Sequence, residues 1–276
     1  RFYIKSQYGI KDTLISNNKI FISYLKQQDD TYSLEPRDNC YYTSIMVADL
    51  NYDYLEFKEF FTPKKCIKES EFNYLAHLSG GRIVEYKNNK LLFSIGDYQT
   101  YIVSQDQSNF YGKIISLNFD GDNPKIVSIG HRNPQGLFYD KKNDTIFNTE
   151  HGPVGGDEVN YNLNPDDKIR DYGWPTSSYG EHKPEHYDYQ LYKKFPLYKS
   201  HSQYGFVEPL KYFVPSIGIS EIVKLKENPE ETNFSVLLVA SMGSLIEEGD
   251  LSLHYIKIDK NFEIKDHQII KVNERI

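Results

Sequence analysis

Short apolar runs that alternate with polar turns make up most of this chain. At four places a turn rich in Asn leads into a run of β-branched, aromatic and Leu residues: 13–25, 88–97, 142–152 and 232–243. In the last three places the run breaks at a glycine, which is typical of strands. The unequal intervals between the runs exclude a simple solenoid and favour sheets of about four strands joined by variable loops.

Further strands are predicted between these four: 44–49, 113–119, 125–129, 219–225 and 253–259. Helical signals are scarce, and residues 50–61 read equally well as a helix or as a strand. Residues 179–204 are loop-like and long enough to form a surface insertion or a lid. Because no linker rich in Gly or Ser interrupts the pattern, we expect one all-β domain over residues 1–276.

Composition narrows the class of protein. The chain has 276 residues, of which 39% are hydrophobic, with 24 Tyr and 16 Phe, so enough apolar area is available for a sizeable core. The formal net charge of -7 argues against nucleic acid as a partner, because a basic surface is required there. No apolar run approaches the roughly 18 residues of a membrane-spanning helix.

The two cysteines leave two readings open. Cys40 and Cys66 form one disulfide if the chain folds in an oxidising compartment, and remain two buried thiols otherwise. Neither stands in a Cys-x-x-Cys spacing beside a His, so a zinc site built on them is not expected.

A His and an Asp form the first candidate for chemistry. His77 precedes a Gly-Gly turn, and Asp97 follows a predicted strand. A carboxylate that fixes the tautomer of an imidazole and stabilises its charged form makes that imidazole a general base. The alternative, a surface His before a tight turn, is favoured by spacing alone.

Two Gly- and Pro-rich segments carry the other candidates. Arg132 and Asn133 lie in His-Arg-Asn-Pro-Gln-Gly, where a guanidinium fork and an amide either bind a ligand or support a β-turn. Residues 150–158 read Glu-His-Gly-Pro-Val-Gly-Gly-Asp-Glu. Such a turn either directs carbonyl and carboxylate oxygens at a hard cation such as calcium or is only a tight turn followed by solvated acids.

Taken together, these motifs resemble one family. The resemblance is carried by His-x-x-Gly-Gly-Arg-Ile (77–83), Gly-Asp (96–97), Gly-Lys-Ile (112–114), Gly-His-Arg-Asn-Pro-Gln-Gly-Leu (130–137), Glu-His-Gly-Pro-x-Gly-Gly-Asp-Glu-x-Asn (150–160), Tyr-Gly-Trp-Pro (172–175) and Pro-Ser-Ile-Gly-Ile-Ser (215–220). In this order they are similar to the glucose/sorbosone dehydrogenase family, the soluble aldose sugar dehydrogenases that depend on pyrroloquinoline quinone (PQQ).

The resemblance implies a six-bladed β-propeller with the cofactor over its central tunnel, in a periplasmic or extracellular enzyme. Family members carry further strands before residue 1 and after residue 276, so we expect a propeller incomplete at both ends. Further sequence or a partner chain would then complete the ring, because open sheet edges are unfavourable. The implied reaction is oxidation of an aldose at C1 to the lactone, with the sugar and the electron acceptor unassigned.

The resemblance also implies a role for each candidate residue. His77 matches the base that takes the proton of the sugar C1 hydroxyl, and Asp97 matches its orienting carboxylate. The residues that match cofactor contacts are Arg132, Asn133, His151 and Ser216. The carbonyls of Gly152 and Pro153 match ligands of the catalytic calcium, and Glu158 with the Tyr172 carbonyl matches a second, structural calcium.

One departure keeps a rival function open. The family places a Lys after the strand that matches 236–240, whereas this chain has Ser-Met-Gly-Ser at 241–244. A propeller that has lost the redox role and acts as a binding or assembly module is therefore the alternative, and a sugar-binding lectin stabilised by calcium is a third.

Overall fold

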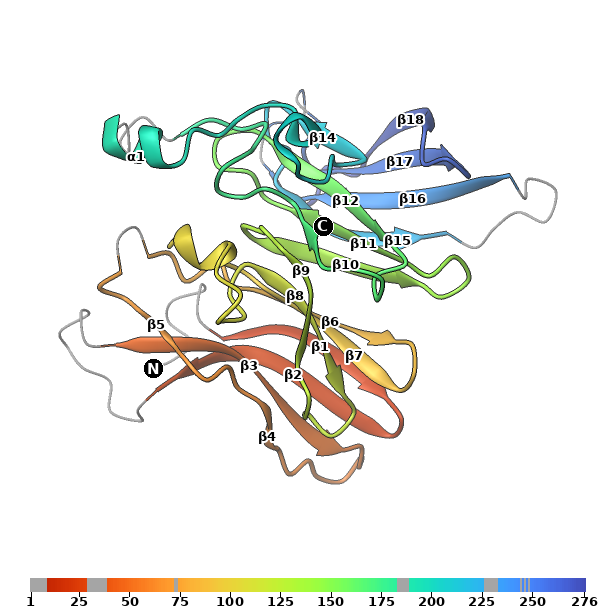
Figure 1. Ribbon diagram of the computed structural model, residues 1–276. Coiled ribbons are helices and arrows are strands. Elements are labelled where there is room, and N and C mark those ends of the chain that lie inside the picture. The colour runs from red at the N-terminus through yellow and green to blue at the C-terminus, as the bar shows by residue number, and fades with distance from the viewer. Residues whose placement is uncertain are drawn as a thin grey trace. The chain divides into compact units, whose positions relative to one another are not determined.

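A computed structural model describes residues 9–28, 39–71, 74–182, 189–225, 233–243, 245, 247 and 249–276. Strands dominate these residues, and the α-helix among them is α1 (Tyr189–Lys194), so the all-β prediction is confirmed (Figure 1). The chain groups into two compact units, residues 1–134 and residues 135–276. No helix in the described ranges is long and apolar enough to cross a membrane.

The first sheet of the first unit is an antiparallel meander. Its order is β1-β2-β3-β4, and β5 also pairs with β3. The bounds are β1 (Ile10–Ser16), β2 (Lys19–Gln27), β3 (Cys40–Asp49), β4 (Lys58–Phe61) and β5 (Ile67–Lys68). The predicted Asn-Asn turn joins β1 to β2, with φ of 49° at Asn17 and 58° at Asn18. Asn tolerates this left-handed conformation, which matches the twist of a hairpin.

The second sheet of this unit has the order β9-β8-β7-β6. Its strands are β6 (Gly80–Tyr86), β7 (Lys90–Ile95), β8 (Lys113–Asn118) and β9 (Lys125–Ile129). The hairpin between β6 and β7 again turns through two Asn with positive φ, Asn88 and Asn89. The same local chemistry therefore starts both sheets.

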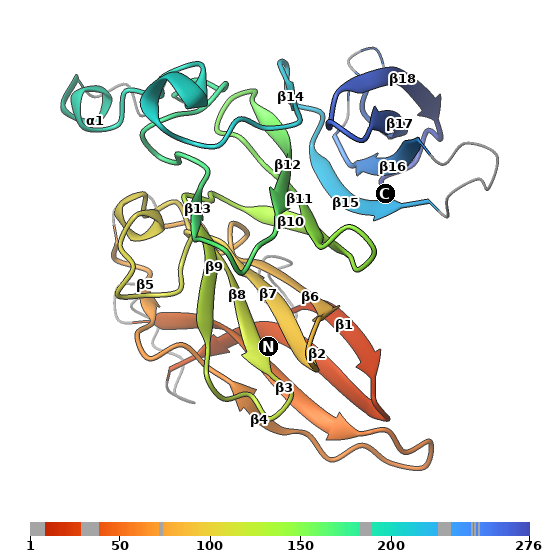
Figure 2. The ribbon, with the colours of Figure 1, turned by 45° about the vertical axis from the view of Figure 1, so that its right-hand side comes forward.

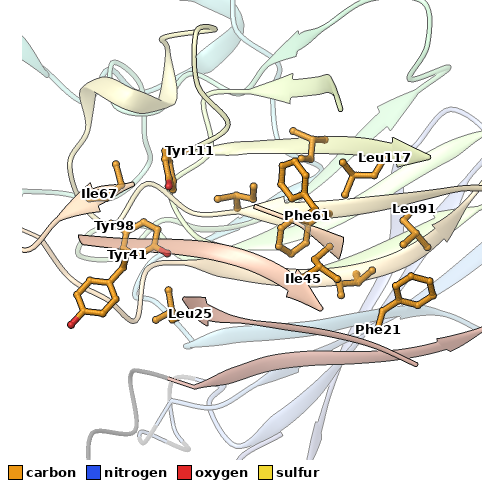
Figure 3. Packing of buried hydrophobic residues seen from close by; sticks show 14 of the residues in the cluster. Phe21, Leu25, Tyr41, Ile45, Phe61, Ile67, Leu91, Tyr98, Tyr111 and Leu117 are labelled. Carbon is orange, nitrogen blue, oxygen red and sulfur yellow. The ribbon is translucent and has the colours of Figure 1, made fainter. Parts of the chain in front are cut away.

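The core of the first unit lies between its two sheets (Figure 3). Phe21 and Ile45 from the first sheet and Phe93 from the second are fully buried, and Phe61 meets Phe93 edge-to-face. Each buried side chain of this size contributes about 1.5–3 kcal/mol of transfer free energy. This apolar contact holds the two sheets of the first unit together.

The second unit repeats the plan. One sheet has the order β10-β11-β12-β14 and the other the order β15-β16-β17-β18 (Figure 2). The strands of the unit are β10 (Pro134–Asp140), β11 (Thr145–Glu150), β12 (Asp157–Leu163), β13 (Arg170–Asp171), β14 (Lys211–Phe213), β15 (Ile219–Lys224), β16 (Phe234–Ser241), β17 (Ser252–Asp259) and β18 (Ile264–Lys271). Its core joins Phe147 and Val159 to Ile222, Leu237 and Ile256.

The strands predicted from the sequence are present, with one ambiguity resolved. Of residues 50–61, the last four form strand β4, and no helix forms there. The reading of 179–204 as loop was wrong in part, because α1 and a 3-10 turn at His201–Tyr204 lie within it. Residues 183–188 of this segment lie outside the described residues.

Cys40 and Cys66 are joined in a disulfide, with their Cα atoms 5.6 Å apart. Pairing of β3 with β5 places Cys40 opposite Lys68, which brings the neighbouring Cys66 within reach. The open choice between a disulfide and two thiols is thereby decided.

We predict that removing this disulfide destabilises the first unit. The sequence separation is 26 residues, and closing a loop of that size restricts the unfolded chain by about 3 kcal/mol. Urea unfolding of the double variant Cys40→Ser/Cys66→Ser should show this loss, with reduced wild-type protein as the control. An unchanged unfolding midpoint in both samples would contradict it.

A pair of His residues joins β17 to β18 in the second unit. Nδ1 of His254 lies 3.0 Å from Nε2 of His267, and Nε2 of His254 lies 2.9 Å from the Gly249 carbonyl oxygen. Because that carbonyl only accepts, His254 donates to it and accepts a hydrogen bond from His267. Burial lowers the pKa of His254 and the charge of Lys211 lowers it too, whereas the hydrogen bond to Gly249 and the charge of Asp250 act in the opposite direction. Burial and the charges of Lys211 and His254 lower the pKa of His267 to about 4, although the charge of Asp266 opposes this shift.

We predict that this pair weakens the fold in acid. An unfolded His titrates near pH 6.5, so below that pH the unfolded chain binds more protons than the folded one, and stability falls as pH drops toward 4. The variant His267→Gln should flatten this part of the curve of unfolding free energy against pH. His77→Gln, at an exposed position, is the control. A curve as steep in His267→Gln as in the wild type would refute the assignment.

Candidate active site

The main chain brings the segments of His77 and Asp97 together in the first unit. His77 lies exposed in the turn before β6, whereas Asp97 follows β7 and is fully buried. Tyr98 N donates to the Leu78 carbonyl and Leu75 N donates to the Tyr98 carbonyl, each at 2.9 Å. Two main-chain hydrogen bonds thus hold the loop of the predicted base against the loop of the predicted carboxylate.

Asp97 organises the start of its own loop. Its Oδ1 accepts a hydrogen bond from Gln99 N at 2.7 Å, and its carbonyl accepts one from Thr100 Oγ1 at 2.8 Å. Asp97 N donates to the Arg132 carbonyl at 2.9 Å. Burial raises the pKa of Tyr101, and the nearby charges of Arg132 and Asp97 act on it in opposite directions. Asp97 and Arg132 therefore share one local environment.

Asn133 ties a third loop to this group. Its Oδ1 accepts a hydrogen bond from Gly80 N at 3.1 Å, so it holds the Gly-Gly turn that follows His77. The approach is close because a Cβ on Gly96 would lie 2.2 Å from the Leu78 carbonyl oxygen. In an antiparallel sheet the start of β6, the end of β7 and the end of β9 lie at the same end of the strands. The loops at this end carry His77, Asp97, Arg132 and Asn133.

The second unit builds its candidate residues around a buried carboxylate that the sequence did not single out. Asp157, at the start of β12, accepts hydrogen bonds from Gly152 N at 3.0 Å, Ser216 Oγ at 2.9 Å and Ile219 N at 3.0 Å. Its Oδ1 lies 3.7 Å from Nδ1 of His151. One side chain thus holds the loop with His151 and Gly152 and the loop with Ser216.

The charge of Asp157 is stabilised in place. Burial raises the pKa of Asp157. The hydrogen bond and charge of His151, together with the hydrogen bonds from Ile219 and Ser216, lower this pKa by more, so the net shift is downward. A carboxylate that accepts several such bonds stays ionised although it is buried. It therefore acts as a fixed negative charge beneath the loop.

The same loop is held from its other side. Val154 and Glu181 exchange main-chain hydrogen bonds of 3.1 and 2.8 Å, and Gly156 N donates to the Phe213 carbonyl at 2.7 Å. A Cβ on Gly152 would lie 2.1 Å from the Gly155 carbonyl oxygen, so only glycine fits there. The Gly152-Pro153 peptide thus sits in a tightly folded turn.

A buried acidic pair occupies the end of the β11–β12 hairpin. Glu150 lies opposite Glu158 in the strand register, and Nδ2 of Asn160 donates to both, at 2.8 and 3.3 Å. Burial first and then the charge of Glu150 raise the pKa of Glu158 well above its ordinary value. Nε2 of His201 lies 3.4 Å from Oε1 of Glu158. Tyr172, also buried, donates to the Tyr161 carbonyl at 2.7 Å.

The carboxylate oxygens of this pair suit a hard cation, because calcium binds carboxylate and carbonyl oxygens. Oδ1 of Asn160 is buried and has no hydrogen-bond partner among the described residues. The described ranges contain no group of three or more His, Cys, Asp or Glu side chains that could hold a metal ion. A cation here would thus rely on few side chains and on main-chain oxygens.

The fold and its sites define a class, a β-propeller built of antiparallel sheets of four or five strands with polar loops at their ends, which confirms the predicted fold. A family profile described as Glucose / Sorbosone dehydrogenase matches residues 3–276. The chain belongs to this family, as the motifs indicated.

Three curated relatives are each 30% identical to the chain. Uncharacterized protein slr1608 of Synechocystis matches over 71% of this chain and 49% of its own length. Aldose sugar dehydrogenase YliI of Escherichia coli matches over 51% and 38%, and Quinoprotein glucose dehydrogenase B of Acinetobacter calcoaceticus matches over 35% and 25%. The match thus spans half or less of the length of these relatives.

Solved structures share the fold at low identity. A crystal structure of a glucose dehydrogenase superposes with a TM-score of 0.74 at 20% identity, covering 96% of this chain and 73% of the other. The PQQ-bound aldose sugar dehydrogenase of Streptomyces coelicolor gives a TM-score of 0.60 at 21% identity, covering 94% and 65%.

Residues 241–243 stand where the family resemblance predicts a Lys. Ser241 is buried and donates to the Gly249 carbonyl at 3.1 Å, and Met242 N donates to the Gly218 carbonyl. A Cβ on Gly243 would lie 2.1 Å from Oδ2 of Asp250. Residues 241–243 thus pack closely without a Lys, while Ser244 lies outside the described residues.

We predict that Asp157→Asn loosens both loops of the second unit. The amide NH₂ replaces an acceptor that faces main-chain N–H groups, which costs roughly 2–4 kcal/mol of unfolding free energy. Amide exchange at Gly152 and Ile219 should accelerate. Because the folded pKa of Asp157 is lowered, its contribution is present above the unfolded pKa and is lost as pH falls through the folded value. Asp167→Asn, at an exposed site, is the control; equal exchange rates in the two variants would disprove the prediction.

Proposed function

We propose that this chain is part of a PQQ- and calcium-dependent dehydrogenase that oxidises an aldose at C1 to its lactone. The observation that carries this proposal lies at one end of the sheet β6–β9. There, hydrogen bonds join the loops that carry His77, Asp97, Arg132 and Asn133. Family membership supports it, and so do the names of the relatives, which include an aldose sugar dehydrogenase and a quinoprotein.

In the proposed reaction His77 accepts the proton of the sugar C1 hydroxyl. Its exposed position leaves it accessible to substrate, and Asp97 stabilises the imidazolium that forms, which is the role of a carboxylate beside a catalytic His. When bound, PQQ supplies the two-electron acceptor for the hydride of C1. The buried environment of Asp97 strengthens its electrostatic influence, since a low dielectric weakens charges less than water does.

The remaining candidates are proposed to hold the cofactor and metal. The residues proposed as cofactor contacts are Arg132, Asn133, His151 and Ser216. The carbonyls of Gly152 and Pro153, in the turn that Asp157 holds, would bind the catalytic calcium. Glu158 and the Tyr172 carbonyl would bind a second calcium, which would also offset the repulsion within the buried acidic pair.

The disulfide bears on the compartment. Disulfides persist in the periplasm and outside the cell, whereas cytosolic thiols stay reduced. We therefore propose a periplasmic or extracellular location, in agreement with the bond between Cys40 and Cys66.

We predict that His77→Ala abolishes most turnover. The protein, with PQQ and calcium added, is assayed on an aldose panel with an artificial electron acceptor. Loss of the general base should lower kcat by about 10²- to 10⁴-fold, while the melting temperature stays unchanged because the side chain is exposed. Lys64→Ala, at another exposed site of the same unit, should keep full activity. A wild type without turnover on any sugar and without a rise in melting temperature on adding PQQ would defeat the proposal.

The second candidate function is a non-catalytic propeller that serves as a binding or assembly module. The close packing of residues 241–243 without a Lys favours it. It predicts no PQQ-induced rise in melting temperature and no functional change in His77→Ala. A lectin, the third candidate, would bind saccharides with calcium present and PQQ absent.

A further inference from the structure

Lys113 is a buried charge for which the proposed reaction has no use. It begins β8 within the Gly-Lys-Ile motif, and its side chain is 0% exposed. Its Nζ donates to the carbonyl oxygens of Val103 at 2.5 Å, Ser104 at 3.2 Å and Tyr111 at 2.7 Å. An ammonium has three donors, and here three main-chain oxygens accept them. Such complete pairing makes a buried charge tolerable.

The three carbonyls belong to the loop that begins at Asp97. This loop joins β7 to β8, and three of its non-glycine residues have left-handed φ: Tyr98 at 55°, Gln99 at 62° and Tyr101 at 57°. Such conformations are unfavourable for residues with a Cβ and persist only where surrounding contacts enforce them. The loop therefore needs restraints along its length.

The start and the middle of the loop are held by different contacts. At the start, Asp97 N bonds to the Arg132 carbonyl, and Tyr98 bonds to the segment that carries His77. In the middle of the loop, Lys113 binds the consecutive carbonyls of Val103 and Ser104, and Gly130 N donates to the Ser104 carbonyl at 3.1 Å. The third carbonyl, of Tyr111, lies where the chain returns to the sheet. The ammonium thus joins the middle of the loop to its end.

We propose that Lys113 is a positioning residue. Its ammonium group, which three carbonyls coordinate, holds the loop 97–111 in the shape that places Asp97 beside the His77 segment. The link to catalysis rests on the proposed function of His77 and Asp97. The clamp itself does not, because every contact that defines it is made between residues of this chain.

The clamp is tested first on the protein without cofactor. Lys113→Met keeps most of the side-chain volume but removes the charge, so the amides of Asp97, Ser104 and Gly130 should exchange at least about tenfold faster than in the wild type. Lys125→Met, at an exposed position of β9, is the matched control. Unchanged protection of all three amides in Lys113→Met would overturn the proposal.

Chemical rescue separates charge from volume. Lys113→Ala lacks the atoms of an n-propylammonium ion, so that ion should raise the melting temperature of this variant, whereas neutral propanol at the same concentration should not. No such rise is expected in Lys113→Met or in the wild type. Equal rescue by propanol would show that the site needs volume rather than a cation and would overturn the proposal.

A measurement on the unaltered protein covers the case in which both variants fail to fold. In ¹⁵N-lysine-labelled wild type, the Nζ protons of Lys113 should be observable and slow to exchange, because three carbonyls hold them away from water. The cross-peak is assigned by its absence from Lys113→Arg. A rapidly exchanging or neutral amine would refute the clamp.

The role in catalysis has its own readout. With PQQ and calcium bound, Lys113→Met should lower kcat by roughly 10- to 100-fold, as small displacements of catalytic groups do, while KM stays within about twofold. Full kcat in Lys113→Met would refute positioning of Asp97. An inactive wild type would instead refute the proposed function and leave the exchange and rescue results to decide the clamp.

Discussion

Buried charges that bond to the main chain of neighbouring loops are the interaction on which both sets of candidate residues depend. In the second unit the Asp157 carboxylate accepts hydrogen bonds from the main-chain N–H groups of Gly152 and Ile219, which are 67 residues apart in sequence. In the first, the Lys113 ammonium donates to three carbonyls of one loop. Each charge satisfies polar main-chain groups that a loop at the end of a sheet would otherwise leave unpaired. The apolar cores fix the strands, whereas these charges fix the loops.

The pattern along the sequence predicted the strands well, because their signals are local. Asn pairs at 17–18 and 88–89 form the predicted turns, with positive φ at each Asn, and β9 has the predicted bounds. Helix α1 was missed because its six residues lie within a long polar segment and are too few to show a helical period. Two readings of 50–61 stayed open because its acidic and aromatic residues fit a helical spacing as well as they fit a strand.

The candidate site was only partly predictable, since its residues were found by motif and its framework by contacts between distant positions. Asp157 stood in the Gly-Gly-Asp-Glu motif, yet its partners Ser216 and Ile219 follow from the pairing of β12 with β14. Lys113 stood in Gly-Lys-Ile, where a Lys at the start of a strand normally faces solvent. A buried charge is recognised only once its burial is known. The disulfide likewise depended on the pairing of β3 with β5.

The polar content of the second unit bears on the choice between an enzyme and a scaffold. A hairpin needed only for stability is served better by apolar residues than by two buried carboxylates, because their burial costs desolvation free energy and their like charges repel each other. Glu150 and Glu158 nevertheless lie opposite each other and share Asn160. Their presence therefore favours a ligand at this end of the sheet over a bare scaffold. A structural cation satisfies that argument in a lectin as well as in a dehydrogenase, so the distinction between those two lies with His77, whose exposed imidazole only the enzyme requires.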